Sequence, residues 1–260
     1  MQSVLLHDVF ARAALRDEPA FLVTRDVLYA DDTLLASQHQ ENLQKMLNDV
    51  VEEGAKYGLE LNWDKTVQIH IATGMSITRP DGGPISTVRE AVYLGGLITC
   101  DGKAASELSR RIGEATGIFN KLRKTWAHSS IGLARKIKIY ETCVLSKLLY
   151  SLDSVWLLRA ERARLDAFHC RSLRRIMGIP CSYVSRISND EVLHRAVAQP
   201  LSNILASRHI ALCNKIANNS AASLVREVLC NLDGTPRSWA TARRRGRPRQ
   251  QWATEVYRMI

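Results

Sequence analysis

Two short apolar segments flank a pair of adjacent carboxylates in the stretch Val27-Leu28-Tyr29-Ala30-Asp31-Asp32-Thr33-Leu34-Leu35-Ala36. Val, Leu, Tyr and Thr favour strands, and a polar pair between two such runs favours a tight turn. The stretch therefore predicts a β-hairpin with Asp31 and Asp32 at its turn. Because two like charges side by side repel each other, a hard divalent cation with oxygen ligands is their natural partner. Mg²⁺ is thus the cofactor that the sequence predicts.

Charge is divided unevenly along the chain. Residues 1–100 contain 8 Lys or Arg and 14 Asp or Glu, a net charge of −6, whereas residues 101–260 contain 28 and 12, a net charge of +16. An acidic front that attracts metal ions and a basic remainder that attracts phosphates fit a polymerase-like protein. The alternative is a basic helical surface that is merely solvated.

The size of the chain and its cysteines bound the class of protein. With 260 residues, 46% of them hydrophobic, the chain can bury a core in one large domain or two small ones. The six cysteines lie far apart and form no C-x-x-C pair, which indicates free thiols of a reducing compartment. His169, Cys170 and Cys181 could supply three zinc ligands, although their spacing matches no standard site. The apolar run at residues 4–6 is too short for a signal peptide or a membrane span, so we expect a soluble intracellular protein with no membrane partner.

The four residues Tyr29-Ala30-Asp31-Asp32 between hydrophobic strands resemble the metal-binding hairpin of reverse transcriptases, and their continuation resembles the non-LTR (LINE-type) retrotransposon enzymes. A helix expected over residues 3–16 precedes the hairpin, as in that family. Reverse transcriptases carry another metal-binding aspartate on a strand well upstream. Because the residues before Asp31 lack that strand pattern, the resemblance implies the C-terminal part of such an enzyme.

A helix and a conspicuous lysine follow the hairpin. Ser37 and Gln40 predict a capping box that opens an amphipathic helix, packed on a sheet and ended by Gly58. From the residues alone Lys65 is a solvated loop lysine. The segment Gly58-Leu59 to Lys65-Thr66, however, resembles the LINE-type enzymes, which implies that Lys65 offsets triphosphate charge or protonates the leaving pyrophosphate. Alternation over residues 67–71 predicts a half-buried strand.

Two adjacent glycines interrupt the strand pattern of residues 91–99, which indicates a bend or a close approach of another group. The stretch Tyr93-Leu94-Gly95-Gly96 resembles the hairpin called the primer grip. That resemblance implies that these four residues position the primer, and that Tyr29 and Ala30 form the floor beside the primer end. A glycine bulge that serves only the fold is the alternative.

From Ala104 onward a helical period predicts three consecutive helices, marked by apolar residues over 108–126, 137–155 and 165–176, the last ended by Gly178 and Pro180. In the family this region is the thumb, which lies against the primer-template duplex. The resemblance therefore implies backbone contacts by basic side chains of the polar faces: Arg110, Arg111, Lys121, Arg123, Lys124, Arg135, Lys136, Lys138, Arg171, Arg174 and Arg175.

Residues 187–197 and 201–216 predict two more helices, followed by an arginine-rich segment that contains Arg243, Arg244, Arg245 and Arg247 and ends in Trp252. Such a segment suits phosphate contact with base stacking. A nuclear import signal or a solubilising arm would have the same composition. The segment also resembles the region after the thumb in LINE-type proteins.

Together these patterns predict an α+β fold with a partial polymerase palm and antiparallel sheet over residues 1–100, a helical thumb over 101–180 and a basic C-terminal extension over 181–260. The resemblance implies RNA-directed DNA polymerase (nucleotidyltransferase) chemistry, with two Mg²⁺ ions held principally by Asp31 and supported by Asp32. The implied partners are an RNA template and a DNA primer, or their duplex, in the nucleus. Because an upstream aspartate is missing, we expect no polymerisation by these 260 residues alone. The alternatives are a non-catalytic nucleic-acid-binding remnant and a helical protein-interaction domain.

Overall fold

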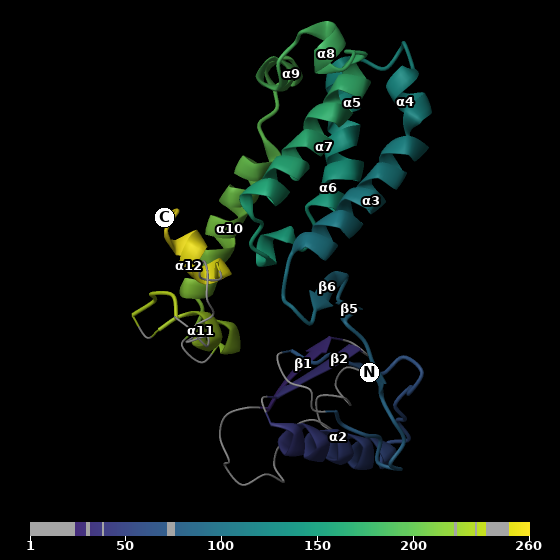
Figure 1. Cartoon of the computed structure of the whole chain (residues 1–260), viewed down its shortest axis with the longest axis vertical. Coiled ribbons are helices and arrows are strands. Elements are labelled where there is room, and N and C mark those ends of the chain that lie inside the picture. The colour runs from purple at the N-terminus through teal and green to yellow at the C-terminus, as the bar shows by residue number, and fades with distance from the viewer. Residues whose placement is uncertain are drawn as a thin grey trace. The chain divides into compact units, whose positions relative to one another are not determined.

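The computed structural model describes residues 24–29, 32–37, 39–71, 76–220, 223–231, 233–237 and 250–260. The chain divides into two compact units, Met1–Lys103 and Ala104–Ile260. The described part of the first unit contains three small sheets and one helix, and the second unit is mainly helical (Figure 1). This mixture of helices and small sheets is compatible with the predicted α+β class. The helix expected over residues 3–16 lies outside the described residues.

The predicted hairpin at the two carboxylates is confirmed for its described residues. Strand β1 (Thr24–Tyr29) pairs antiparallel with β2 (Asp32–Ser37), and Tyr29 is the partner of Asp32. Ala30 and Asp31, which connect the strands, lie outside the described residues. Helix α2 (Gln40–Ala55) packs on this hairpin and buries Leu47 and Val50, so the predicted amphipathic helix is also confirmed.

The predicted capping box of α2 is wrong. The Oγ of Ser37 accepts a hydrogen bond from the N–H of His39 at 3.1 Å and donates to the carbonyl of the same residue at 3.0 Å. The side-chain amide of Gln40 instead donates to the carbonyl of Ser76 at 2.7 Å. Ser37 still belongs to β2, so its hydroxyl bonds to its near neighbour and does not reach the first turn of the helix. At the other end, Gly58 (φ +69°) follows the helix as predicted.

The predicted strand over residues 67–71 shrinks to two residues. Strand β3 (Val67–Gln68) pairs in parallel with β4 (Ser86–Thr87), and Val67 and Ile71 are 41% and 59% exposed. The side chain of Gln68 takes the inward position: its oxygen accepts from the N–H of Ile77 at 3.0 Å, and its amide donates to the carbonyl of Ile85 at 3.0 Å. The polar side chain therefore holds the loop backbone, which reverses the expected faces of the strand.

The two glycines after Tyr93 belong to a second hairpin. Strand β5 (Glu90–Tyr93) pairs antiparallel with β6 (Gly96–Thr99), and Tyr93 is the partner of Gly96. The two turn residues, Leu94 and Gly95, have φ of +49° and +77°, the left-handed values that two-residue hairpins favour. Because every strand residue has one partner, the alternative of a glycine bulge is wrong.

The second unit contains ten α-helices among its described residues, together with the π-helix η1 (Tyr140–Leu145) and the 3₁₀-helix η2 (Leu152–Ser154). The α-helices are α3 (Ala105–Lys121), α4 (Arg123–Ala127), α5 (Leu133–Ile139), α6 (Ser146–Leu148), α7 (Arg159–Met177), α8 (Ser182–Ser185), α9 (Asn189–Ala196), α10 (Leu201–Ala217), α11 (Leu224–Leu229) and α12 (Trp252–Tyr257). The three predicted helices are present, the first interrupted at Leu122 and the second ending at Leu148. Gly178 (φ +67°) ends α7, and α9 and α10 fall where two further helices were predicted.

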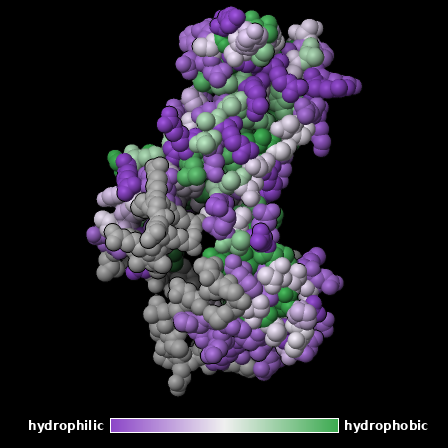
Figure 2. All heavy atoms as spheres, in the orientation of Figure 1, coloured by the Kyte–Doolittle hydropathy of each residue, from purple (hydrophilic) through white to green (hydrophobic). Residues whose placement is uncertain are grey.

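The core of this unit lies between α3, α7 and the run from α5 to α6 (Figure 1). The rings of Phe119 and Trp126 stack with centroids 5.1 Å apart, and the indole N–H of Trp126 donates to the carbonyl of Phe119 at 2.9 Å. Hydrophilic residues cover much of the visible surface of these helices (Figure 2). Within the described ranges, no helix is both long enough and apolar enough to cross a membrane.

Candidate functional site

The acidic edge of the first hairpin begins at Asp32. This residue opens β2 opposite Tyr29, and its side chain is exposed. No cation of the described residues forms an ion pair with Asp32. Asp31 and Ala30 lie outside the described residues, as does the side chain of Tyr29. The structure therefore places one of the two predicted carboxylates, Asp32, at the end of a strand with its side chain exposed.

The second hairpin lies within electrostatic range of this carboxylate. Burial raises the pKa of Tyr93, and the negative charge of Asp32 raises it further. Charges act over limited distances in water, so the charge of Asp32 reaches the phenol of Tyr93, the first residue of the predicted primer-positioning stretch. Leu94, Gly95 and Gly96 follow at the turn of the same hairpin.

Lys65 lies on a turn that Asn62 holds. The side-chain oxygen of Asn62 accepts from the N–H groups of Asp64 at 3.1 Å and Lys65 at 3.2 Å, and the Thr66 hydroxyl donates to the carbonyl of Asn62 at 2.8 Å. The Lys65 side chain is exposed, and no ion pair with another described residue holds it. No contact joins Lys65 to Asp32 or Tyr93 in the described part of the chain. Its predicted catalytic role stays a prediction.

Exposed cations gather where α3 ends and α4 begins. Lys121, Arg123 and Lys124 are exposed, and none forms an ion pair with a described residue. Basic side chains from α5 and α7 contact Trp126 and Phe119 nearby. The ammonium of Lys136 donates to the carbonyl of Trp126 at 2.7 Å, and the guanidinium of Arg175 lies 5.3 Å from the centre of the Phe119 ring. These helices therefore bring several cations to one region of the unit.

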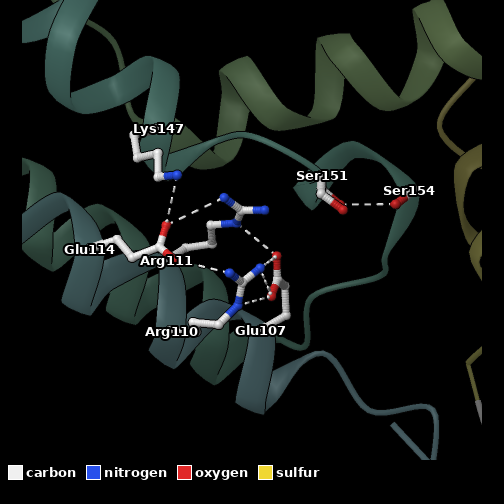
Figure 3. Close-up of polar contacts among 7 residues, drawn as sticks. All are labelled: Glu107, Arg110, Arg111, Glu114, Lys147, Ser151 and Ser154. Carbon is white, nitrogen blue, oxygen red and sulfur yellow. Dashed lines mark hydrogen bonds and ion pairs between the residues drawn. The ribbon is translucent and has the colours of Figure 1, made fainter. Parts of the chain in front are cut away.

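Arg110 and Arg111 belong to an internal ion-pair cluster (Figure 3). Arg111 is 1% exposed, and its Nε donates to Glu107 at 2.7 Å. Arg110 donates to the same carboxylate at 2.8 Å and to Glu114 at 3.0 Å. Burial corrects the prediction that Arg111 contacts phosphates, whereas Arg110 keeps 25% of its side chain exposed and its phosphate contact stays a prediction. The spacing of Glu107 and Glu114, three and four residues from the arginines, is a signal in the sequence for these pairs.

The same cluster sets the charge of Glu114. Burial raises its pKa, but the hydrogen bond and charge of Lys147 and the charges of Arg110 and Arg111 outweigh burial, so the pKa is lowered overall. The ammonium of Lys147 lies 3.3 Å from the carboxylate. Glu114 is therefore an ionised member of the cluster near neutral pH.

Arg174 is another arginine that the structure removes from the predicted surface. Its side chain is 5% exposed, and its guanidinium donates to the carbonyls of Pro180 at 3.2 Å and Ile187 at 2.6 Å. Arg171 and Arg175, which flank it on α7, are exposed. The three arginines thus have different roles despite their neighbouring positions in the sequence.

Trp252 packs inside the C-terminal part of the second unit. Its indole N–H donates to the carbonyl of Asp153 at 2.9 Å, and its ring meets His209 edge-on with centroids 6.0 Å apart. The neighbouring Gln250 accepts from the indole N–H of Trp156 at 3.3 Å. Trp252 is half-buried by these contacts, and its stacking on bases stays a prediction. The four predicted contact residues Arg243, Arg244, Arg245 and Arg247 lie outside the described residues.

The histidine and cysteines of the zinc alternative have other surroundings. His169 is buried, its Nδ1 lies 3.0 Å from the Tyr140 hydroxyl, and burial lowers its pKa to about 4. In the described ranges, no group of three or more His, Cys, Asp or Glu side chains could hold a metal ion. All six cysteines are free thiols, as predicted. The magnesium site at Asp31 and Asp32 stays a prediction, because Asp31 is not among those residues.

Comparison with known proteins shows what parts of the chain are similar to. Residues 4–98 match the family model of reverse transcriptase (RNA-dependent DNA polymerase). A transposon-derived protein of Caenorhabditis elegans is 26% identical to the chain over 181 residues, which cover 68% of this chain and 63% of that protein. No solved structure matches the chain significantly. These findings support a reverse transcriptase origin of the chain.

Proposed function

We propose that the chain is part of the reverse transcriptase of a non-LTR (LINE-type) retrotransposon, an enzyme that adds deoxynucleotides to a DNA 3′ end on an RNA template. The observation that carries this proposal is the register of the first hairpin, which puts Asp32 opposite Tyr29 beside the turn, with Tyr93 in electrostatic range. In this proposal the first unit contains the C-terminal part of the palm, and the helices from α3 to α7 are the thumb.

The donor set at the first hairpin suits Mg²⁺. Asp31 and Asp32 offer carboxylate oxygens, the ligands that this hard ion prefers, and Asp32 has no described cation as partner. When bound, Mg²⁺ would activate the primer hydroxyl and stabilise the leaving pyrophosphate. We assign Asp31 as the principal ligand and Asp32 as its support.

Other residues of the first unit would position the reactants. Tyr93 to Gly96, at the second hairpin, would hold the primer end near the carboxylates, with Tyr29 and Ala30 beneath it. Lys65 would place an ammonium at the leaving group, where it offsets charge without needing a fixed bidentate geometry. The Asn62 turn supports this role, because it fixes the backbone from which the lysine side chain extends.

Metal binding tests the hairpin directly. Titration of the whole chain with Mn²⁺, followed by electron paramagnetic resonance, measures the fraction of bound ion without any need for activity. We expect Asp31→Asn and Asp32→Asn each to weaken binding about tenfold, because each removes one charged oxygen ligand. Asp64→Asn, at an exposed aspartate of the Asn62 turn, is the matched control. Equal binding by all three variants and the wild type would refute the proposed site.

Primer extension tests the expected inactivity. We propose that these 260 residues do not incorporate nucleotides by themselves, because the family site needs a further carboxylate to hold two ions. The assay uses an RNA template, a DNA primer and Mg²⁺. Robust extension that Asp31→Ala abolishes would contradict this expectation and show that the chain holds a complete site.

The exposed cations favour a second candidate function, a non-catalytic nucleic-acid-binding protein. Lys121, Arg123 and Lys124 could contact phosphates whether or not the hairpin binds metal. Their combined replacement by alanine should lower the slope of log affinity against log salt by about one for each phosphate that is no longer neutralised. Arg208→Ala, at an exposed residue of α10, is the control. Nucleic-acid binding without metal binding at the hairpin would favour this candidate over the polymerase.

A further inference from the structure

The connection between α7 and α9 exposes an aromatic ring. Residues 178–188 contain the short helix α8, on which Tyr183 is 79% exposed and its neighbour Val184 is 65% exposed. The ring of Tyr183 is therefore accessible to a partner, and what the partner would be follows from the groups around the ring. Neither the proposed palm chemistry nor the ion-pair cluster involves this segment.

Arg174 holds this connection in one conformation. From its buried position on α7, its guanidinium donates to four oxygens of the segment that follows: the Pro180 carbonyl at 3.2 Å, the Ser185 hydroxyl at 3.3 Å, the Ile187 carbonyl at 2.6 Å and the Asn189 side chain at 3.2 Å. Because a ring on a fixed segment loses little conformational entropy when it binds, this arrangement suits recognition.

A cation lies against the exposed ring. The guanidinium of Arg186 is 5.4 Å from the centre of the Tyr183 ring. Arg186 has φ +58°. This left-handed backbone conformation is unfavourable for residues other than glycine and persists only where the surrounding structure fixes it. The high exposure of Tyr183 leaves the rest of the ring to solvent.

The surrounding sequence is basic. Residues 167–189 contain no Asp or Glu and four arginines, of which Arg174 is buried and the other three are exposed. Arg171 and Arg175 are exposed one to two turns before the connection. The first acids beyond it are Asp190 and Glu191, and the carboxylate of Glu191 is bound by Arg195 at 2.6 Å. This balance of charge favours an anionic partner.

We propose that Tyr183 and Arg186 form a stacking site for an unpaired nucleotide of a single-stranded nucleic acid. The base would stack on the tyrosine ring while the guanidinium contacts the adjoining phosphate, the combination that single-strand-binding proteins use. The inference rests on the proposed function, since it takes nucleic acid as the partner. It goes further because a base inside a duplex has no free face for the ring, so the site selects unpaired nucleotides.

Binding of single-stranded and duplex oligonucleotides of equal length tests the site. Fluorescence anisotropy with the whole chain at one fixed salt concentration gives both affinities. We expect Tyr183→Ala to weaken single-strand binding at least about fivefold, the effect of losing one stacked base, and to leave duplex binding unchanged. Tyr183→Trp should keep single-strand affinity. The matched control is Tyr257→Ala, at a tyrosine of α12 that is 48% exposed.

Three outcomes would overturn the inference. A single-strand affinity of Tyr183→Ala equal to that of Tyr257→Ala would show that the ring binds no base. An equal loss for both nucleic acids would show that the segment acts through general charge. If the wild type binds neither nucleic acid, the proposed function and this site fail together, whereas the first two outcomes leave the proposed function intact.

Discussion

Replacement of Glu107 by glutamine tests the internal ion-pair cluster of α3. In the wild type, Glu107 binds the buried Arg111 at 2.7 Å, and a second carboxylate, Glu114, lies 3.5 Å from this guanidinium and is shared with Lys147. Glutamine keeps the shape and one acceptor oxygen but removes the charge. Arg111 would then remain buried, and its remaining negative partner would be the carboxylate of Glu114, which is farther away and also pairs with Lys147.

The expected loss of stability follows from this burial. Removing one partner of a buried ion pair costs about 3–5 kcal/mol, because the remaining charge stays out of water without compensation. Glu114 and the ring of Tyr150, 4.7 Å from the guanidinium, offset part of that cost. We therefore expect a loss of about 3 kcal/mol, at the lower end of the range for such pairs.

Urea unfolding measures this loss. Four of the five tryptophans lie in residues 104–260, so their fluorescence follows the helical unit. The midpoint should fall while the slope stays constant. Glu141→Gln is the matched control, because Glu141 and Lys138 form an exposed pair at 3.7 Å whose loss costs less than about 1 kcal/mol.

A double variant separates the physical causes. If the uncompensated charge of Arg111 is the problem, Glu107→Gln with Arg111→Met should be more stable than Glu107→Gln alone, since the second change removes that charge. The reasoning is refuted if Glu107→Gln costs no more than the Glu141→Gln control. It is also refuted if the losses of the two single variants simply add.

Three further predictions concern the helical unit. Burial lowers the pKa of His169 to about 4, below its ordinary value near 6.5, so the histidine of the unfolded chain binds a proton at a higher pH than that of the folded chain. The stability that the neutral, buried His169 contributes should therefore be fully present above pH 6.5 and fall as the pH drops toward 4. The urea midpoint of His169→Gln should fall less over that range. Arg174→Met leaves four oxygens without their donor and should cost about 2 kcal/mol, with faster amide hydrogen exchange in residues 180–189; unchanged exchange there would contradict the role assigned to Arg174. Gly178→Ala meets no atom within 4 Å but must keep φ +67°, so thermal unfolding should show a loss of about 1 kcal/mol.

Local patterns predicted the elements of the fold well where they were regular. The spacing of apolar residues along the sequence predicted the hairpin at Asp32, helix α2 and the main helices of the second unit. The prediction was wrong at Ser37 and Gln68, where a polar side chain bonds to backbone groups nearby in space. Such bonds depend on how loops fold back, which no period of hydrophobic residues encodes.

The candidate site was predictable only in part. Tyr29-Ala30-Asp31-Asp32 identified the acidic edge, but the nearness of Tyr93 to Asp32 depends on the packing of distant segments. The Glu107 and Glu114 spacing could have indicated that carboxylates bind Arg110 and Arg111. Arg174 gave no such signal, because its partners are mostly backbone carbonyls, which every residue carries.

The attachment of Trp252 ties the last helix to the middle of the second unit. Helices α11 and α12 both pack on α10, and the indole N–H of Trp252 donates to the carbonyl of Asp153, 99 residues earlier in the chain, at 2.9 Å. A cut in the chain before residue 250 would therefore take away both a helix that packs on α10 and the donor that the Asp153 carbonyl accepts from.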